Sequence, residues 1–222
     1  MKKFIVFCLL FFIVTCASAQ KVCNCSANKN WSEGISCKDI ILKNKSKLYW
    51  QFNCDSSWLT FQNKLGEKKI IYSLELVGYT GRLGYSYATE YKAGFLIQNN
   101  LISGCCTPPE YILYSKMTGK EIINLGPLIY YSVRYNDPLI VSYNTDALVV
   151  YNIETKKRMK IDLPKGVVAW TLKAGELPEP EYLFDAKLIG SVLIIKYRYL
   201  KIKTKDTWLN TIVKIDLTKY KS

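Results

Sequence analysis

The chain has 222 residues, with 31 Lys and Arg against 18 Asp and Glu, and it contains no histidine. This length suffices for one domain with a sizeable hydrophobic core. Without histidine the chain lacks the usual general base and the commonest transition-metal ligand, which disfavours most hydrolytic and metal-dependent chemistry. We predict no cofactor and no metal site.

Residues 1–19 have the organisation of a secretory signal peptide. Lys2 and Lys3 precede an apolar run over residues 4–14, and small residues follow up to Ala19, after which we expect cleavage. The apolar run is too short for a lasting membrane helix, and no later stretch is long and apolar enough to span a bilayer. We therefore predict an exported protein of bacterial type, periplasmic or extracellular, with no transmembrane segment.

A lipid anchor at Cys16 is the competing interpretation of this end of the chain. Residues 13–16 vaguely resemble a bacterial lipobox, although Thr15 stands where that pattern has Gly, Ala or Ser. The resemblance implies a chain anchored to a membrane rather than free in solution.

Six cysteines lie beyond the signal: Cys23, Cys25, Cys37, Cys54, Cys105 and Cys106. An even number in an exported chain predicts disulfides, and the poorly patterned segment of residues 20–54 holds four of the six. We expect each of Cys105 and Cys106 to bond a different N-terminal cysteine, with Cys37 bonded to Cys54. A bond between Cys105 and Cys106 and a four-cysteine metal site are the alternatives.

Further along, the periodicity is almost entirely that of β-strands. Short segments rich in Val, Ile, Tyr and Trp are bounded by Gly, Pro, Asn and Asp. They are residues 48–52, 111–114, 139–143, 147–151, 167–170 and 192–197. No window beyond the signal keeps an apolar face at helical spacing over ten residues. The predicted class is all-β, with one domain over residues 55–222 that follows the cysteine-rich segment of residues 20–54.

A ragged repeat runs through this pattern in residues 58–76, 111–126 and 148–164. Each copy has an apolar and aromatic strand, a polar turn with Gly or Thr and then Lys, and a second alternating strand. Residues 211–221 either open a fourth copy or close the preceding unit. Such strand, T-G-K turn and strand units resemble the blades of secreted bacterial β-propellers. The resemblance implies successive antiparallel meanders, propeller-like or sandwich-like, with a barrel as the next option.

Motifs for catalysis are weak. The segment GYSYA, residues 84–88, looks like a nucleophile elbow, but Ala88 replaces the last glycine and the chain has no histidine to activate Ser86. We interpret Gly78 and Gly81, together with Gly84, as turns or bulges between strands. Carboxylates near strand ends keep a polysaccharide hydrolase or lyase open as an alternative. They are Asp55, Glu75, Glu90, Asp137, Asp146, Asp185 and Asp206.

Seventeen tyrosines are the positive indication of a binding surface. Tyrosine suits contacts with sugars and proteins, although β-strands are rich in tyrosine for packing reasons alone. Our candidate binding residues are Tyr87, Tyr91, Tyr131 and Tyr135.

Removing Lys2 and Lys3 leaves 29 basic against 18 acidic residues, a formal charge of +11. A solvated lysine coat is the plain interpretation of this charge, and an acidic protein or an anionic envelope polysaccharide is the predicted kind of partner. Nucleic acid is not expected, because no nucleic-acid-binding motif is visible. We predict an exported, non-enzymatic binding or interaction protein of the cell envelope, with a carboxylate-based polysaccharide hydrolase or lyase and a structural envelope component as alternatives.

Overall fold

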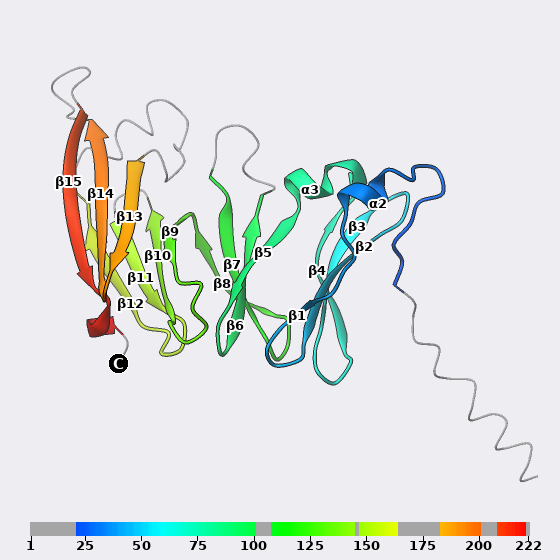
Figure 1. Ribbon diagram of the computed structural model, residues 1–222, viewed down its shortest axis with the longest axis horizontal. Coiled ribbons are helices and arrows are strands. Elements are labelled where there is room, and N and C mark those ends of the chain that lie inside the picture. The colour runs from blue at the N-terminus through cyan, green and yellow to red at the C-terminus, as the bar shows by residue number, and fades with distance from the viewer. Residues whose placement is uncertain (1–20, 101–107, 145–146, 164–182, 201–207, 221–222) are drawn as a thin grey trace, which may run out of the picture.

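Four antiparallel sheets follow one another along the chain, from one end of the molecule to the other (Figure 1). The computed structural model describes residues 21–100, 108–144, 147–163, 183–200 and 208–220. Within each sheet, strands that are neighbours in the sequence are also neighbours in space. The predicted all-β fold of successive antiparallel meanders is confirmed, and it takes the propeller-like form, because the sheets lie side by side in chain order.

The first sheet has the order β1-β2-β3-β4 and contains the first predicted repeat as its β3–β4 hairpin. Its strands are β1 (Ile40–Ile41), β2 (Lys47–Phe52), β3 (Ser57–Gln62) and β4 (Lys68–Leu74). The turn between β1 and β2 contains Lys45 with φ +68°, and the turn before β4 contains Gly66 with φ +90°. Two of these strands begin before residue 55, inside the cysteine-rich segment.

The second sheet contains the T-G-K turn that defined the repeat. Its strands are β5 (Tyr85–Glu90), β6 (Gly94–Asn99), β7 (Glu110–Ser115) and β8 (Glu121–Gly126). Gly119 turns the chain between β7 and β8 with φ +61°, and a Cβ there would collide with the ring of Phe61 from the first sheet. This glycine therefore serves both the hairpin and the packing of two sheets.

The third and fourth sheets repeat the meander. The third contains β9 (Leu128–Tyr131), β10 (Leu139–Asn144), β11 (Ala147–Asn152) and β12 (Arg158–Asp162). The fourth contains β13 (Phe184–Ile189), β14 (Val192–Leu200) and β15 (Trp208–Asp216), in that order. The segment from residue 211 thus belongs to the closing strand of the fourth sheet. The predicted strand at residues 167–170 lies outside the described residues.

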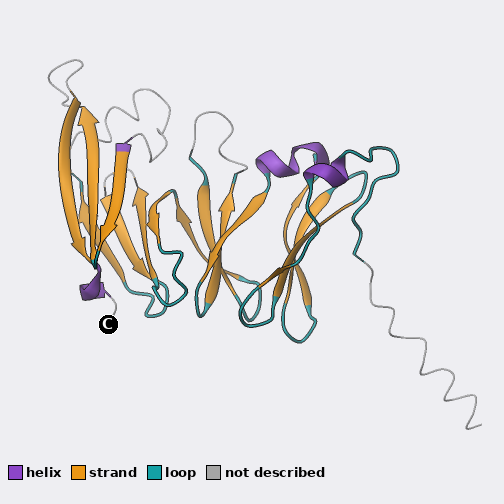
Figure 2. Ribbon diagram, in the orientation of Figure 1, coloured by secondary structure: helices purple, strands orange, loops and turns teal. Residues whose placement is uncertain are grey.

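Helical structure in the described residues is short and lies mainly at the first sheet (Figure 2). The elements are α2 (Trp31–Gly34), the 3-10 helix η1 (Val77–Tyr79), α3 (Thr80–Leu83) and the 3-10 helix η2 (Leu217–Tyr220). Gly78 and Gly81 lie in η1 and α3, so the turns predicted between strands at these glycines are single helical turns between β4 and β5. The single helical turns carry the chain from the first sheet to the second.

Buried apolar clusters join each sheet to the next. Typical members are Phe61 and Phe95 between the first and second sheets, Leu113 and Ile140 between the second and third, and Leu148 and Ile195 between the third and fourth. Burying a side chain of this size stabilises the fold by roughly 1.5–3 kcal/mol. The core of the molecule therefore lies between the sheets.

Two disulfides tie the N-terminal segment, and their connectivity corrects our expectation. They are Cys23–Cys37, with a Cα–Cα distance of 6.4 Å, and Cys25–Cys54, with 4.7 Å. The predicted Cys37–Cys54 bond is wrong, and so are the predicted bonds from the N-terminal cysteines to Cys105 and Cys106, which themselves lie outside the described residues. Cys25 packs with Ile35, Phe52 and Val77 in a small cluster of its own, which allows the segment to fold back on the first sheet.

A buried ion pair within the second sheet is hydrogen-bonded to a turn of the first sheet. The Lys116 side chain is 2% exposed, and its Nζ donates to Glu90 Oε2 at 2.5 Å and to the Tyr91 carbonyl oxygen at 3.0 Å. From the β1–β2 turn, the Lys43 backbone N–H donates to the Glu90 carboxylate at 3.1 Å, and the Ser46 hydroxyl donates to the Lys116 carbonyl oxygen at 3.2 Å. One lysine of a predominantly exposed set is therefore a core residue.

Candidate functional site

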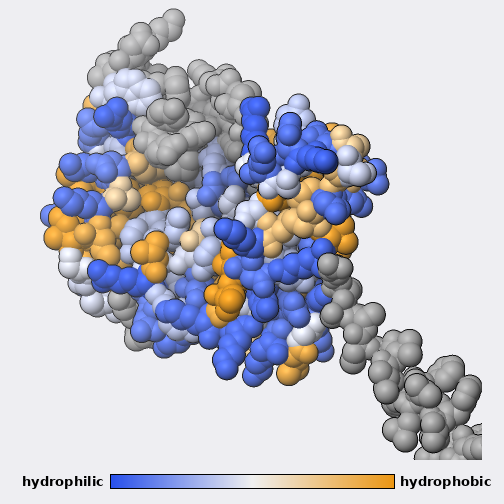
Figure 3. Space-filling model, turned by 45° about the vertical axis from the view of Figure 1, so that its right-hand side comes forward, coloured by the Kyte–Doolittle hydropathy of each residue, from blue (hydrophilic) through white to orange (hydrophobic). Residues whose placement is uncertain are grey.

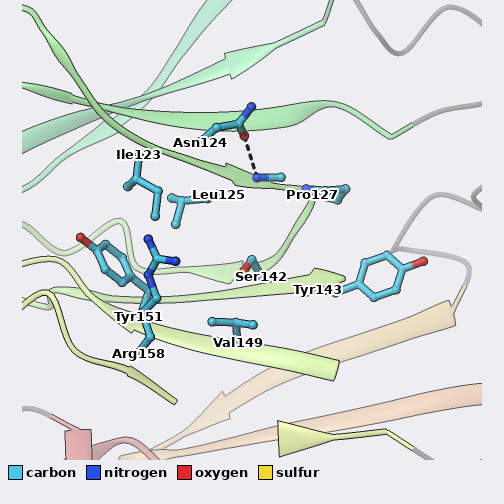
Figure 4. A pocket seen from close by; sticks show the side chains of 10 residues that line it. Ile123, Asn124, Leu125, Pro127, Ser142, Tyr143, Val149, Tyr151 and Arg158 are labelled. Carbon is cyan, nitrogen blue, oxygen red and sulfur yellow. Dashed lines mark hydrogen bonds between the residues drawn. The ribbon is translucent and has the colours of Figure 1, made fainter. Parts of the chain in front are cut away.

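A cleft of about 400 Å³ opens between the second and third sheets (Figure 4). The edge strand β8 and the following turn form one wall, and strands β10, β11 and β12 form the other. The lining residues are Ile123, Asn124, Leu125, Gly126, Pro127, Ser142, Tyr143, Val149, Tyr151 and Arg158. This volume lies within the range of small-ligand sites in proteins.

One wall of the cleft forms because alternate side chains of β11 point toward the second sheet and toward the fourth sheet. Leu148 and Val150 are buried against the fourth sheet, whereas Val149 and Tyr151 lie on the face toward the second sheet. On the opposite wall, Gly126 has φ +67°, and a Cβ added to it would meet nothing within 4 Å. The end of β8 therefore leaves open space where Gly126 has no side chain.

Arg158 provides the charge in this cleft. Its guanidinium carbon lies 5.6 Å from the centroid of the Tyr151 ring, a cation–π arrangement. In the part of the chain that the structure describes, no carboxylate forms an ion pair with Arg158. Figure 4 shows the guanidinium between the two walls, facing Leu125 and Ile123 of β8. The ring orients the cation, and the donors of the guanidinium remain available to a ligand.

The amide side chain of the β8 wall is hydrogen-bonded within the protein. Asn124 Oδ1 accepts the Gly126 backbone N–H at 2.8 Å, and Asn124 Nδ2 donates to Glu110 Oε2, also at 2.8 Å. The Tyr143 ring points away from the cleft (Figure 4). Among the described residues, Arg158, the Ser142 hydroxyl and the Tyr151 hydroxyl are thus the polar side-chain groups of the cleft that remain for a ligand.

The phenols of Tyr143 and Tyr151 stay neutral at physiological pH. Burial raises the pKa of Tyr143, and burial raises that of Tyr151 against a smaller lowering by Arg158. No Asp or Glu is among the described residues of the lining. This part of the lining is therefore mainly apolar with one positive group, and it offers no acid pair for general acid–base chemistry.

The four tyrosines predicted to bind a partner converge on the region where the first three sheets meet. Tyr91 is 0% exposed, and its hydroxyl has no hydrogen-bond partner among the described residues. Burial is the main cause that raises the pKa of Tyr91, and the neighbouring hydroxyls of Tyr131, Tyr130 and Tyr87 raise it further. Tyr91 is therefore a core residue in this structure, because its ring fills the contact between the second and third sheets.

The other three predicted tyrosines are half-buried. Burial, together with the Glu90 carboxylate, raises the pKa of Tyr87 to about 12. The ring of Tyr131 lies 5.6 Å from that of Tyr111. The ring of Tyr135 receives Lys43 Nζ at 3.8 Å from its centroid. These rings make contacts within the protein, and a binding role for them stays a prediction.

Hydrophilic side chains cover much of the face seen in Figure 3, with separate apolar patches among them. Sequence reasoning did not single out the Arg158 cleft. A signal was present, because only four of the 31 basic residues are arginines, and Arg158 is one of them. Arginine, unlike lysine, presents a planar set of donors that matches a carboxylate, so a rare arginine in a lysine-rich chain marks a site worth examining.

In the described ranges, no group of three or more Cys, Asp or Glu side chains is placed to hold a metal ion. None of the helices within those ranges is long and apolar enough to cross a membrane.

No protein-family model matches the chain, and no curated protein resembles it significantly in sequence. Among solved structures it is similar to the WD40 domain of SCAP from fission yeast, with 8% identity, a TM-score of 0.30, and coverage of 77% of this chain and 49% of that one. It is also similar to a hypothetical selenium-binding protein from Sulfolobus tokodaii, with 12% identity, a TM-score of 0.26, and coverage of 76% and 45%. The chain spans about half the length of these structures. The all-β, propeller-like class of the chain is assigned from its own four sheets.

Proposed function

We propose that this chain is an exported, non-enzymatic binding protein of the cell envelope that recognises an acidic partner protein through the Arg158 cleft. The carrying observation is the arginine itself: its guanidinium lies over Tyr151 at the mouth of an apolar cleft, with no ion-pair partner among the described residues. Arginine forms bidentate, charge-assisted hydrogen bonds with a carboxylate, which are about twice as strong as neutral ones.

The walls of the cleft favour a protein ligand over a polysaccharide. Ile123, Leu125 and Val149 present aliphatic surface to the space beside the arginine. Sugars pack on exposed aromatic faces, but Tyr151 is 3% exposed and Arg158 lies over its ring. A protein segment with an Asp or Glu beside a Leu, Ile or Val matches both the arginine and the aliphatic surface of the cleft.

Export is supported from two sides. Residues 1–19 have the pattern of a signal peptide, and two disulfides indicate an oxidising compartment. A polysaccharide hydrolase or lyase gains no support from this cleft, because no carboxylate is among the described residues that line it.

The proposal is tested with fluorescent peptides in which Glu alternates with Leu, compared with peptides of equal length in which Gln replaces Glu. We expect the Glu peptide to bind the wild-type protein at least tenfold more tightly. Arg158→Ala should weaken the Glu peptide by roughly 10- to 100-fold, the effect of losing a charge-assisted hydrogen bond, and leave the Gln peptide unchanged. Arg158→Lys should fall between the two.

Arg82→Ala is the matched control, because Arg82 is an exposed arginine on α3, outside the cleft lining. It removes the same charge from the surface. Equal binding of the Glu and Gln peptides to the wild-type protein, or an equal loss in both arginine variants, contradicts the proposal, as does the absence of peptide binding.

A further inference from the structure

The fourth sheet presents an outer face that combines basic residues with exposed apolar side chains. The third sheet packs against the other face, where Leu193 and Ile195 of β14 are fully buried. Strand alternation turns Lys196 and Arg198 of the same strand outward, and both are exposed. Their cross-strand neighbours on β13 and β15 complete this outer face.

Four cations lie close together on it. In register, Lys187 and Lys214 flank Ile194, whereas Lys196 and Arg198 follow along β14. Neighbouring strands are about 4.8 Å apart, so Lys187 and Lys214 start from backbone positions about 10 Å apart. Among the described residues none of the four forms an ion pair, although Asp185 pairs in register with Lys196.

Exposed apolar side chains are interspersed with these cations. Ile189 is 54% exposed, Ile212 is 55% exposed and Trp208 is 45% exposed, and all three stand on the outer side of β13 or β15. An apolar surface that includes an aromatic residue and is surrounded by Lys and Arg has the composition of a membrane-interface surface. The three apolar side chains share one face with the four cations, which distinguishes them from singly scattered exposed apolar residues.

A groove of about 530 Å³ is lined by outer-face residues of this sheet together with Leu183, Phe184 and Thr211 from its buried side. Lys196 and Arg198 lie in its lining together with Asn210, Thr211 and Ile212, and Asp185 is the acid within it. Two cations and the amide of Asn210 suit the oxygens of a phosphodiester headgroup, and Ile212 continues the groove into the apolar part of the face.

We propose that the outer face of the β13–β15 sheet binds the surface of an anionic phospholipid membrane. The cations meet headgroup phosphates, and Ile189, Ile212 and Trp208 enter the interfacial region. A membrane accounts for both features of the face, whereas a soluble polyanion accounts for the charges and leaves the isoleucines unexplained. The Arg158 cleft lies between other sheets, so this proposal does not depend on the proposed function.

The experiment measures binding of the protein without its signal peptide to vesicles of phosphatidylcholine alone or with an equal amount of phosphatidylglycerol, in 0.1 M salt. Binding is expected with phosphatidylglycerol only. Lys196→Ala with Arg198→Ala should weaken it by about 25-fold, near fivefold for each cation. Lys64→Ala with Lys69→Ala removes the same charge from exposed positions of the first sheet and should change binding less than threefold.

Two further readouts separate a membrane from general attraction of a basic protein. Ile189→Ser with Ile212→Ser should weaken vesicle binding at least fivefold, whereas Ile41→Ser with Ile70→Ser, also at exposed positions, should not. Brominated phosphatidylglycerol should quench tryptophan emission, and Trp208→Phe should remove most of that quenching.

An equal loss of vesicle binding in the Lys196/Arg198 double variant and in the Lys64/Lys69 double variant would show non-specific attraction and overturn the proposal. Unchanged binding after both isoleucines are replaced, or tighter binding to a soluble anionic polysaccharide than to vesicles, would do so as well. Arg158→Ala should leave vesicle binding unchanged, so the two proposals fail by different results.

Discussion

The Lys116–Glu90 pair gives the sharpest test of how the sheets are held together. Lys116→Met keeps most of the length and apolar surface of the side chain but removes the ammonium group. The Glu90 carboxylate, whose side chain is 12% exposed, then loses a hydrogen bond of 2.5 Å and keeps the Lys43 backbone N–H. An uncompensated buried charge costs about 3–5 kcal/mol, and the partial hydration of Glu90 favours the lower end, near 3 kcal/mol.

Urea unfolding at neutral pH measures this loss as a lower midpoint at a constant m-value. For a domain of this size, a loss of 3 kcal/mol also lowers the melting temperature by roughly 6–12 °C. Lys120→Met is the matched control in the same hairpin, because Lys120 is exposed, and it should change the free energy of unfolding by less than about 0.5 kcal/mol.

The double variant Lys116→Met with Glu90→Gln separates charge burial from packing. Removing both charges leaves no ion in the core, so the double variant should be more stable than Lys116→Met alone by about 1 kcal/mol or more. A cost below about 1 kcal/mol for Lys116→Met, or simple additivity of the two substitutions, would refute the reasoning, because either result means that the pair is not buried and coupled.

Three further predictions follow from the packing. Gly119→Ala should destabilise the protein by about 2–4 kcal/mol, since it adds a left-handed non-glycine residue and a collision with Phe61, whereas Gly190→Ala, also at positive φ but beside open space, should cost only about 1 kcal/mol. Peptide mapping without reductant should recover the disulfides Cys23–Cys37 and Cys25–Cys54. It should recover no disulfide between these four cysteines and residues 105–106. In an alkaline titration followed by phenolate absorbance, Tyr87 should remain protonated to about pH 12. Since its folded pKa is raised, the unfolded chain loses that proton first, near pH 10, and stability should fall between pH 10 and 12; a single titration near pH 10 for all tyrosines would contradict the structure.

Local features of the fold were readable from the sequence. The alternation in residues 48–52, 111–114 and 147–151 predicted strands that the structure contains, because a pleated strand places neighbouring side chains on opposite faces. The T-G-K turn predicted a hairpin, since Gly119 supplies the positive φ that this turn requires. The even number of cysteines indicated disulfides.

Contacts between segments far apart in the sequence followed only from the stacking of the sheets. The sequence around Lys116 is that of an ordinary exposed hairpin turn. Lys116 is buried because the second sheet lies against the turn of the first sheet that contains Lys43. Tyr91 looked like its neighbours in a tyrosine-rich strand, yet it fills the contact with the third sheet. The disulfide partners depend on how the N-terminal segment folds back, which spacing does not encode.

The sequence by itself determined the all-β class and the hairpins, because these depend on residues within a few positions of one another. The tertiary structure decided which residues form a site. Arg158 and Leu125 are 33 positions apart, and they line one cleft only because β8 and β12 belong to adjacent sheets whose facing sides leave space between them. Strand periodicity places each side chain on a face, and the stacking of the sheets determines what that face meets.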